Sequence, residues 1–398
     1  MSTPALVRPR PEHRAADLLA AYLPGSFFYS SARGSLLADG VHALVDTGRG
    51  PRADTAAAAL SDAVAAGVDD PVVVGALGFG PDAQACLVVP ALVRRAGARG
   101  DEAAPVPLPG RWSVRRRPEP QGYLDGVRRA LALIADGALE KVVLARGLEL
   151  TADRPVPVPA LLARLVAADP AAHAFAVDVT APGDAAPRTL VGASPELLVS
   201  RDGDVVRANP LAGSIPRAGD PDEDARRVAA LRASDKDRRE HAVVAAQVAE
   251  VLGRFCTDLR VPARPEVLGT ATMWHLSSPV TGRLTDPSVS SLALAEALHP
   301  TPAVCGTPLQ AARGAIAEIE GSDEFLDRGY YSGLVGWCDA DGDGEWAVTL
   351  RSAEVSGSTV QLFAGAGVVA GSEPSAELAE TGAKFRTLLR AIGLEDPA

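Results

Sequence analysis

Lysine is scarce in this sequence of 398 residues. Lys and Arg together number 39, but lysine occurs only at Lys141, Lys236 and Lys384. Arginine keeps its proton in proteins, whereas a lysine removed from water can lose it. The scarcity therefore singles out Lys141, which begins the apolar segment KVVLARG. The alternative is an ordinary lysine at a solvated strand end.

Net positive charge and long apolar runs are also missing. The formal net charge is −11, which gives no support for binding to nucleic acid or to an anionic membrane surface. No apolar run approaches the ~18 residues that a membrane span requires, and the first residues lack the apolar region of a signal peptide. We therefore expect a cytoplasmic protein that binds neither nucleic acid nor membrane.

Cysteine is rare and scattered. Four cysteines, Cys86, Cys256, Cys305 and Cys338, lie far apart, with no CxxC and no histidine at zinc spacing. This pattern excludes a disulfide framework and a structural zinc site. We expect small buried thiols in a reducing compartment.

The composition is sufficient for a large core, because 47% of the residues are hydrophobic. The segment 98–122 is the only long stretch rich in proline, glycine and charge, so it is the best internal boundary. Within it, RWSVRRRPEP at 111–120 is interpreted as a solvated connector.

Apolar patterns predict strands with groups of helices between them. We expect strands within 25–40, 71–80, 141–150, 189–213, 331–355 and 358–369. We expect an alanine-rich helix between the first two strand regions, and further helices at 121–136, 222–255 and 375–393. This order indicates the α+β class with largely antiparallel sheets.

Two of the expected helices carry carboxylates beside their apolar stripes. Asp237 and Glu240 extend the buried face of the helix 222–255, and Glu377 and Glu380 share a strip with Lys384. These two acidic pairs could converge on one hard cation such as Mg²⁺, which takes oxygen ligands and keeps several waters. The alternatives are a surface ion pair and support of a helix start.

Other motifs fail on spacing. DADGDG at 339–344 opens like a calcium loop, but Leu350 stands where a bidentate Glu is needed, which leaves a hairpin turn. GAGVVAG at 365–371 does not match GxGxxG. Ser194 in GASPE lacks the GxSxG elbow. These mismatches exclude a calcium loop, a nicotinamide site and a serine hydrolase.

In this order the segments resemble the chorismate-utilising enzymes, and within them the isochorismate synthases of catecholate siderophore pathways. The matching stretches are GSFFYSSARGSLLADG, LEKVVLARG, LVGASPELLVS, ANPLAGSIPR, SDKDRREH, MWHLSSP, LHPTPAVCGTP, GLVGWCDADGDGEWAVTLRSAEV, LFAGAGVV and ELAETGAK. They cover nearly the whole chain and are densest from 137 to 386.

The resemblance implies an α+β (α/β layered) architecture. Two antiparallel β-sheets pack face to face with helices on the outside, in the anthranilate-synthase-like chorismate-binding fold. Residues 1–398 then form a single domain, with 1–120 as its N-terminal part and 121–390 as its catalytic region. The boundary at 98–122 becomes a loop.

The resemblance also implies an acid and a base. Lys141 corresponds to the general base that activates water for attack at C2 of chorismate. Glu196, in SPELL, corresponds to the general acid that protonates the departing C4 hydroxyl. Lys141 must therefore spend time neutral and Glu196 must spend time protonated, and burial favours both of these forms.

The remaining roles concern the metal and the substrate. Glu240 of REH and Glu380 of AET correspond to ligands of a Mg²⁺ cofactor that holds the C1 carboxylate of chorismate, with Asp237 and Glu377 lying outside them. The groups implied to orient the substrate are Gly213, Ser214, His275, Tyr331, Arg351, Ala366, Gly367 and Lys384. From the residues alone, His275 could equally be a satisfied core histidine.

Comparison with other branches of the family favours water as the nucleophile, because ammonia-using anthranilate synthases generally lack a lysine at the position of Lys141. Ala212 in PLAGS stands where aminodeoxychorismate synthases carry a covalent lysine. We therefore expect a monomeric, Mg²⁺-dependent isochorismate synthase whose product feeds 2,3-dihydroxybenzoate and siderophore synthesis. One alternative is a salicylate synthase, which goes on to eliminate pyruvate. Another is a catalytically silent chorismate-binding paralogue.

Overall fold

The computed structural model describes residues 13–48, 50–80, 83–99, 108, 110–321 and 327–394. Within these residues, a long antiparallel sheet contains ten strands. In spatial order these are β18 (Gly306–Thr307), β8 (Lys141–Ala152), β22 (Thr359–Val369), β21 (Ser352–Ser356), β10 (Arg188–Ser194), β9 (His173–Asp178), β1 (Phe27–Ser31), β2 (Gly34–Asp39) and β6 (Leu92–Ala96), with β7 (Trp112–Arg117) paired to β8.

A second antiparallel sheet has nine strands among the described residues. They are β14 (Cys256–Arg260), β17 (Val280–Leu284), β12 (Val205–Ala208), β11 (Leu197–Asp202), β20 (Gly344–Val348), β19 (Leu334–Asp339), β4 (Val72–Leu77), β5 (Ala85–Val89) and β3 (Ala43–Leu44). A small third sheet contains β13 (Leu211–Pro216), β16 (Met273–Ser277) and β15 (Glu266–Gly269).

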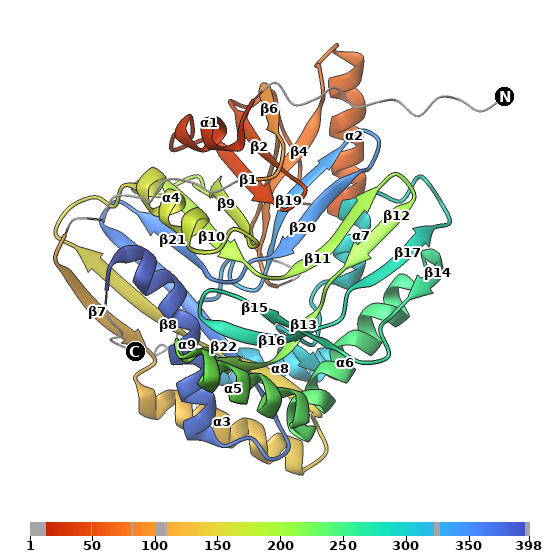
Figure 1. The fold of residues 1–398 in the computed structure, drawn as a ribbon. Coiled ribbons are helices and arrows are strands. Elements are labelled where there is room, and N and C mark those ends of the chain that lie inside the picture. The colour runs from red at the N-terminus through yellow and green to blue at the C-terminus, as the bar shows by residue number, and fades with distance from the viewer. Residues whose placement is uncertain are drawn as a thin grey trace.

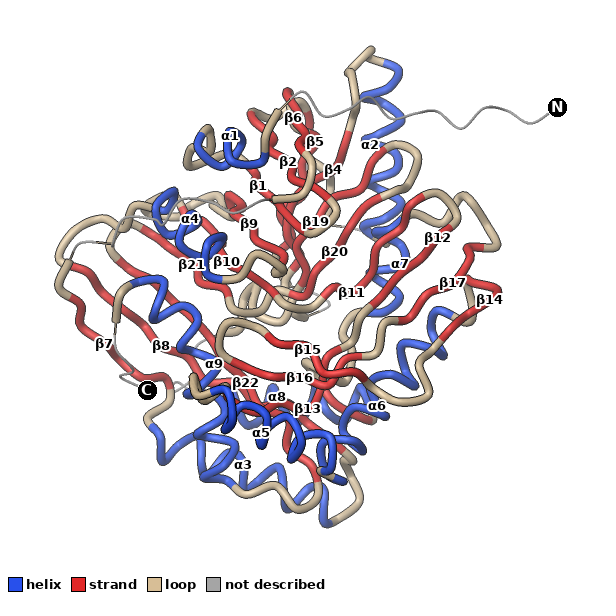
Figure 2. The backbone as a smooth tube through the Cα atoms, in the orientation of Figure 1, coloured by secondary structure: helices blue, strands red, loops and turns tan. Residues whose placement is uncertain are grey.

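Helices cover the outer faces of the sheets (Figure 2). They are α1 (Ala15–Ala20), α2 (Arg52–Ala65), α3 (Pro120–Ala135), α4 (Val158–Ala168), α5 (Pro221–Ala233), α6 (Asp235–Leu252), α7 (Ser291–Leu298), α8 (Leu309–Glu320) and α9 (Pro374–Ile392). In Figure 1, α3 and α9 lie together beneath β8 and β22. None of the helices in the described ranges is long and apolar enough to span a membrane.

The two long sheets face each other across a buried apolar layer. Phe27 and Tyr29 of the ten-stranded sheet belong to the same hydrophobic cluster as Val72, Val74 and Ala347 of the nine-stranded sheet. Alternate residues of a strand point to opposite faces, so the other faces are left for the helices to cover. The fold class predicted from the sequence is confirmed.

The expectation of a solvated connector at 111–120 is wrong. Residues Trp112–Arg117 form β7, which pairs with β8 in a register that places Trp112 opposite Ala152. The strand is half-buried on alternate residues, and its partner lies more than thirty positions away in the sequence. Arginine-rich composition concealed a strand that is defined by this distant pairing.

The single helix expected over 222–255 is also wrong, because the chain forms α5 and α6 with a break at Ser234. Ser234 has an extended backbone, and its hydroxyl accepts a hydrogen bond from the Asp237 amide. Serine at this position caps a new helix, which satisfies an amide that has no partner within the helix. The break gives α6 its own direction while leaving Glu240 on its buried side.

The chain passes between the long sheets several times, and two of these crossings lie at adjacent places. It leaves the ten-stranded sheet at the end of β10 and enters the nine-stranded sheet at β11, and it returns from β20 to β21. Because β10 pairs with β21 and β11 pairs with β20, the two crossings run side by side. Glu196 lies on the first crossing and Arg351 on the second.

Candidate active site

A cavity lies at the two crossings. Its wall includes Glu196 and Arg351 from the crossings, Glu240 from α6, and Glu380 and Lys384 from α9. Residues far apart in the sequence therefore meet at the junction of the two sheets. The further predicted residues that line the same cavity are Gly213, Ser214, His275, Tyr331 and Gly367.

Glu196 is a buried carboxyl with a raised pKa. Only 2% of its surface is exposed, and burial raises its pKa from 4.5 to about 7. A hydrogen bond with the Leu211 backbone and the charges of Lys141 and Arg351 act against this shift without cancelling it. Near neutral pH, Glu196 is therefore divided between its protonated and ionised forms.

Lys141 is the first residue of β8 and is 1% exposed. It has strand neighbours on both sides, Thr307 of β18 and Val369 of β22. Its Nζ lies 2.9 Å from Glu240 Oε1. Burial pushes the pKa of Glu240 upward, but Lys141, Lys384 and Lys236 together outweigh this effect, so the pKa lies below its usual value.

The other two lysines pair with glutamates as well, and both of these glutamates are on α9. Lys384 Nζ is 2.6 Å from Glu380 Oε1 and donates a hydrogen bond to the Gly365 carbonyl at 2.8 Å. Lys236, at the start of α6, donates to Glu377 Oε1 at 2.8 Å. The Glu377 side chain is 1% exposed, and burial raises its pKa. All three lysines of the sequence thus contact carboxylates in or directly beside the cavity.

His275 presents a free ring nitrogen to the cavity. Its Nδ1 lies 2.7 Å from Ser214 Oγ, while its buried Nε2 has no hydrogen-bond partner among the residues that the structure describes. Burial, together with Arg351 and Lys384, lowers the pKa of His275 well below its usual value. The imidazole is therefore neutral. When the Ser214 hydroxyl donates to Nδ1, the ring proton is on Nε2, which is then able to donate a hydrogen bond to a bound ligand.

Arg351 holds a strained backbone position at the cavity wall. Its φ of 49° is in the left-handed region, which costs a non-glycine residue ~1–2 kcal/mol. The Arg351 side chain is buried. At the same cavity, the Tyr331 ring stacks on the Phe363 ring, and the two ring centroids are 5.3 Å apart. Strain at a cavity wall is typical of a functional position.

Two glycines allow a close approach of the side chains around the cavity. A Cβ atom at Gly367 would lie 2.4 Å from Glu240 Oε1 and 3.0 Å from Lys141 Cε. Gly213 has a φ of +73°, and a Cβ atom there would lie 2.9 Å from Asp237 Cβ. A larger residue at Gly367 would displace the Glu240 carboxylate and the Lys141 side chain, and one at Gly213 would push β13 away from α6.

Some predicted residues lie near the cavity without lining it. Lys141 contacts the cavity wall through Glu240 and Gly367, and Asp237 and Glu377 lie at the neighbouring turns of α6 and α9. Ala366 is buried on β22 between two glycines that do line the cavity. The apolar part of the wall could not be predicted from the sequence, because it has no chemical signature of its own. It consists of Val143, Pro195, Leu211, Ala212, Ala303, Val304 and Leu350.

The residues present fit a Mg²⁺ ion with few protein ligands. Glu240 and Glu380 both line the cavity, and each already holds a cationic ammonium group. The described residues include no cluster of three or more potential metal ligands. Two carboxylates, with the remaining positions left to water and substrate, form the donor set that Mg²⁺ commonly takes.

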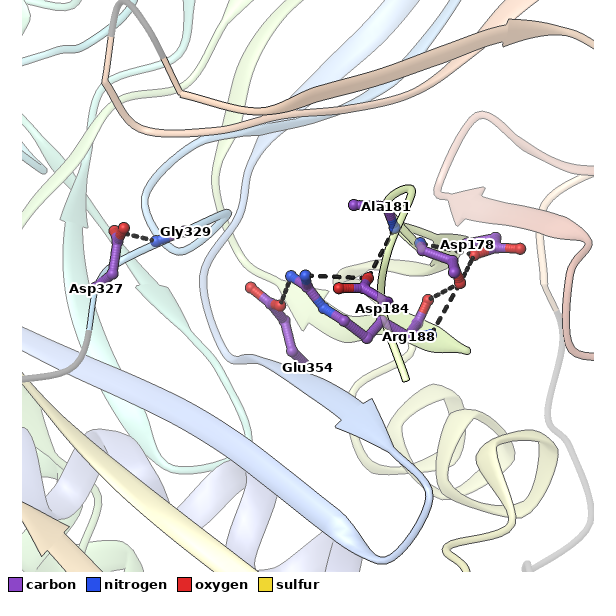
Figure 3. A network of polar contacts seen from close by, with 8 residues as sticks. Asp178, Ala181, Asp184, Arg188, Asp327, Gly329 and Glu354 are labelled. Carbon is purple, nitrogen blue, oxygen red and sulfur yellow. Dashed lines mark hydrogen bonds and ion pairs between the residues drawn. The ribbon is translucent and has the colours of Figure 1, made fainter. Parts of the chain in front are cut away.

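A second polar network lies away from this cavity (Figure 3). Arg188 on β10 contacts Glu354 Oε2 at 2.6 Å and Asp184 Oδ2 at 3.3 Å. Asp184 also accepts a hydrogen bond from the Ala181 amide at 2.7 Å. None of these residues lines the cavity, and the contacts cross-link β10, β21 and the loop before β10.

Comparison with known proteins gives one consistent result. The family described as chorismate binding enzyme matches residues 94–393. Isochorismate synthase DhbC of Bacillus subtilis is 49% identical over 392 residues, which cover 96% of this chain and 98% of that protein. Isochorismate synthase EntC of Escherichia coli K12 is 38% identical over 388 residues, which cover 94% of this chain and 97% of that protein.

Solved structures agree with the sequence relatives. The structure of DhbC from Bacillus anthracis has a TM-score of 0.91 at 43% identity and covers 96% of this chain and 100% of its own. Anthranilate synthase component I from Streptococcus pneumoniae shares the fold, with a TM-score of 0.68 at 20% identity over 98% and 95% of the two chains. The family predicted from the sequence motifs is confirmed, and the chain belongs to the chorismate binding enzymes.

Proposed function

We propose that this protein is an isochorismate synthase, which interconverts chorismate and isochorismate. The observation that carries the proposal is that Glu196 lines the cavity while Lys141 lies directly behind its wall, beside Glu240. Lys141 and Glu196 are almost fully buried, and they come from β8 and from the crossing between the two sheets. The strong similarity to two isochorismate synthases over nearly their full length supports the same reaction.

In this reaction water adds at C2 of chorismate while the C4 hydroxyl leaves. Lys141, in its neutral form, takes the proton from the water. Glu196, in its protonated form, gives a proton to the departing hydroxyl. The C2–O bond forms as the C4–O bond breaks, and both ring double bonds shift, from C1=C2 and C5=C6 to C6=C1 and C4=C5. A carboxyl with a pKa of about 7 is well matched to proton transfer near neutral pH.

The substrate is a dianion, and the cavity supplies local positive charge. Arg351 and Lys384 line it, and Lys384 is held by Glu380 and the Gly365 carbonyl. Glu240 and Glu380 would hold Mg²⁺, which neutralises the C1 carboxylate of the substrate when bound. Preorganised charges in a cavity of low dielectric constant stabilise developing charge better than water does.

Further polar groups of the cavity orient the substrate. Ser214 fixes the His275 ring, whose Nε2 then donates to a ligand oxygen. The backbones of Gly213, Ala366 and Gly367 keep β13 and β22 close to the substrate, and the Tyr331 ring closes one wall. These contacts hold the ring with C2 toward Lys141 and C4 toward Glu196.

The proposal includes a cellular setting. The four cysteines are free, in keeping with a reducing compartment such as the cytoplasm. We propose that the protein acts there as a monomer. A solved structure similar to this chain is described as specific to 2,3-dihydroxybenzoate, which supports a role for the product in the synthesis of that compound and of catecholate siderophores.

The test is to incubate the protein with chorismate, with and without Mg²⁺, to identify the product by chromatography and to assay pyruvate. We expect isochorismate only with Mg²⁺, and no pyruvate. Salicylate with an equal amount of pyruvate would identify a salicylate synthase instead. No turnover in the presence of Mg²⁺ would contradict the proposal and favour a silent chorismate-binding paralogue.

A further inference from the structure

The strand that carries Lys141 has a gap along one edge. On this side, β18 pairs with Lys141 and Val142, and β7 pairs with the residues from Gly147 to Ala152. Between β18 and β7, no strand in the described part of the chain pairs with residues 143–146 along this edge. The Val143 amide donates to the Cys305 carbonyl at 2.7 Å, which leaves the Val143 carbonyl and the Ala145 amide to be satisfied.

An ion pair from two other segments fills this gap. Glu320, the last residue of α8, accepts a hydrogen bond from the Ala145 amide at 2.8 Å. Arg328 donates to the Val143 carbonyl at 2.8 Å. The two side chains also bind each other as a fork, with Arg328 Nε and Nη2 at 2.7 and 2.6 Å from the two Glu320 oxygens. We name Glu320 and Arg328 the β8 bridge.

Arg328 reaches two further parts of the cavity wall, one through its guanidinium and one through its backbone. Arg328 Nη1 donates to the Val304 carbonyl at 3.1 Å, and Val304 lines the cavity. The backbone carbonyl of Arg328 accepts from the Tyr331 amide at 2.8 Å. The intervening turn is fixed by Asp327, whose carboxylate accepts from the Gly329 amide at 3.0 Å (Figure 3). Arg328 thus connects three segments of the wall, two through its buried side chain and one through its backbone.

We propose that Glu320 and Arg328 are positioning residues for the reaction, because they act as a substitute strand that holds the Lys141 end of β8 against the wall at Val304 and Tyr331. Their role rests on the proposed function of Lys141. Neither side chain lines the cavity, so they act through backbone position and make no contact with the substrate.

The geometry explains why these two residue types are needed. The side chains are 5% and 7% exposed, and every contact of the bridge is directional. Lysine has one nitrogen in place of the planar fork, so it keeps the charge at position 328 but cannot reach Glu320, Val143 and Val304 together. A shift of about 1 Å in a reacting group reduces turnover by as much as about a hundredfold.

The chain contains a matched control. Arg201 and Asp343 form another buried pair, with side chains 6% and 8% exposed and 3.6 Å apart. Arg201 also donates to two backbone carbonyls, those of Gly203 and Val289. This pair lies near the β11–β12 and β19–β20 hairpins and does not line the cavity. Replacing either arginine by lysine removes a buried guanidinium that lies beside a carboxylate and donates to two backbone carbonyls.

The experiment compares Arg328→Lys and Glu320→Gln with Arg201→Lys, each assayed well below its own unfolding temperature. For the two bridge variants we expect kcat to fall about tenfold or more while KM for chorismate changes less than about threefold. Arg201→Lys loses thermal stability but keeps its kcat. If the bridge variants keep the wild-type kcat, or lose no more than Arg201→Lys, the positioning role is refuted.

A second measurement does not depend on activity. Amide hydrogen exchange is followed by mass spectrometry on peptides covering residues 139–148. Arg328→Lys should exchange faster there than the wild type, whereas Arg201→Lys should not. Unchanged exchange in Arg328→Lys would overturn the inference. A wild-type protein with no isochorismate formation would instead overturn the proposed function, and the exchange comparison would then decide the bridge alone.

Discussion

Two charged regions of the molecule show opposite uses of positive charge. At the cavity, the cations Lys141 and Lys384 each contact one carboxylate, Glu240 and Glu380, through a single nitrogen. At the β10–β21 network of Figure 3, Arg188 contacts two carboxylates through two different nitrogens and joins two strands to a loop. The first arrangement is a set of point charges, and the second is a cross-link.

This difference explains the composition of the sequence. Arginine forms the other ion pairs in the part of the chain that the structure describes, where its fork and permanent charge suit cross-linking. Each of the two cavity lysines lies beside a carboxylate, Glu240 or Glu380, that would hold Mg²⁺ under the proposed function. An ammonium group can release that carboxylate by moving one atom, whereas a fork must break several contacts together.

The largest effect is expected from exchanging the cations. Lys141→Arg should reduce isochorismate formation by about 10²–10⁴-fold, nearly as much as Lys141→Ala, because arginine cannot act as a neutral base. Arg188→Lys, the reverse exchange in the other network, should change kcat little. Steady-state rates for the three variants test this. Substantial activity of Lys141→Arg would refute the role of Lys141 as the base.

The next effect concerns Glu196 and pH. The acid must be protonated, so the contribution of Glu196 to kcat/KM is full below its pKa of about 7 and falls as pH rises above it. Glu196→Gln should be slower by about 10²–10⁴-fold and should lack this decline. A pH–rate profile of both proteins tests the prediction, and the same decline in the variant would show that another group causes it.

At the same residue, the substitution that lowers activity should raise stability. The folded protein disfavours ionised Glu196, so the free energy of unfolding that depends on this group is full below 4.5 and is lost as pH rises to about 7. Glu196→Gln should therefore become more stable relative to the wild type over this interval. Thermal unfolding at a series of pH values measures the difference, and a constant difference would contradict a raised pKa.

A smaller effect is expected from Glu380→Gln. This variant keeps the shape of the side chain but removes one of the two proposed anionic ligands. The Mg²⁺ concentration for half-maximal activity should rise about tenfold or more. Calorimetric titration of Mg²⁺ in the presence of chorismate gives a readout apart from turnover. An unchanged Mg²⁺ requirement would exclude Glu380 as a ligand.

The smallest effect is expected at Lys236, which is partly exposed and lies one turn before Glu240. Lys236→Met leaves the buried Glu377 without its cation, so the free energy of unfolding should fall by about 1 kcal/mol. The double variant with Glu377→Gln should recover part of this loss, because a neutral amide costs less to bury than an unpaired carboxylate. Denaturant unfolding measures both, and additive losses would exclude the pairing.

The sequence could predict what lies within short motifs. The strand at Lys141, the C-terminal helix and the turn at 339–344 have local patterns, and the structure contains all three. The strand β7 could not be predicted, since it depends on pairing with the far end of β8. The single-domain organisation stays a prediction.

The same distinction holds for the cavity. Glu196, Glu240 and Glu380 lie in recognisable motifs, and the structure brings them to one wall. The partner of Lys236 lies 141 positions away, so no local pattern reveals that it binds Glu377. Glu320 and Arg328 lie outside the motifs. They bind backbone atoms of β8, and such contacts leave no pattern in the sequence. Chemical roles were therefore more visible in the sequence than the side chains that position them.

The central claim, water addition at C2 coupled to loss of the C4 hydroxyl, is tested most directly with ¹⁸O-labelled water. The protein is incubated with chorismate and Mg²⁺ in labelled water, and isochorismate from the first turnovers is analysed by mass spectrometry. Our account predicts one solvent-derived oxygen in each isochorismate, located at C2, and no release of pyruvate. Isochorismate without label would contradict it, because the hydroxyl would then have moved within the substrate.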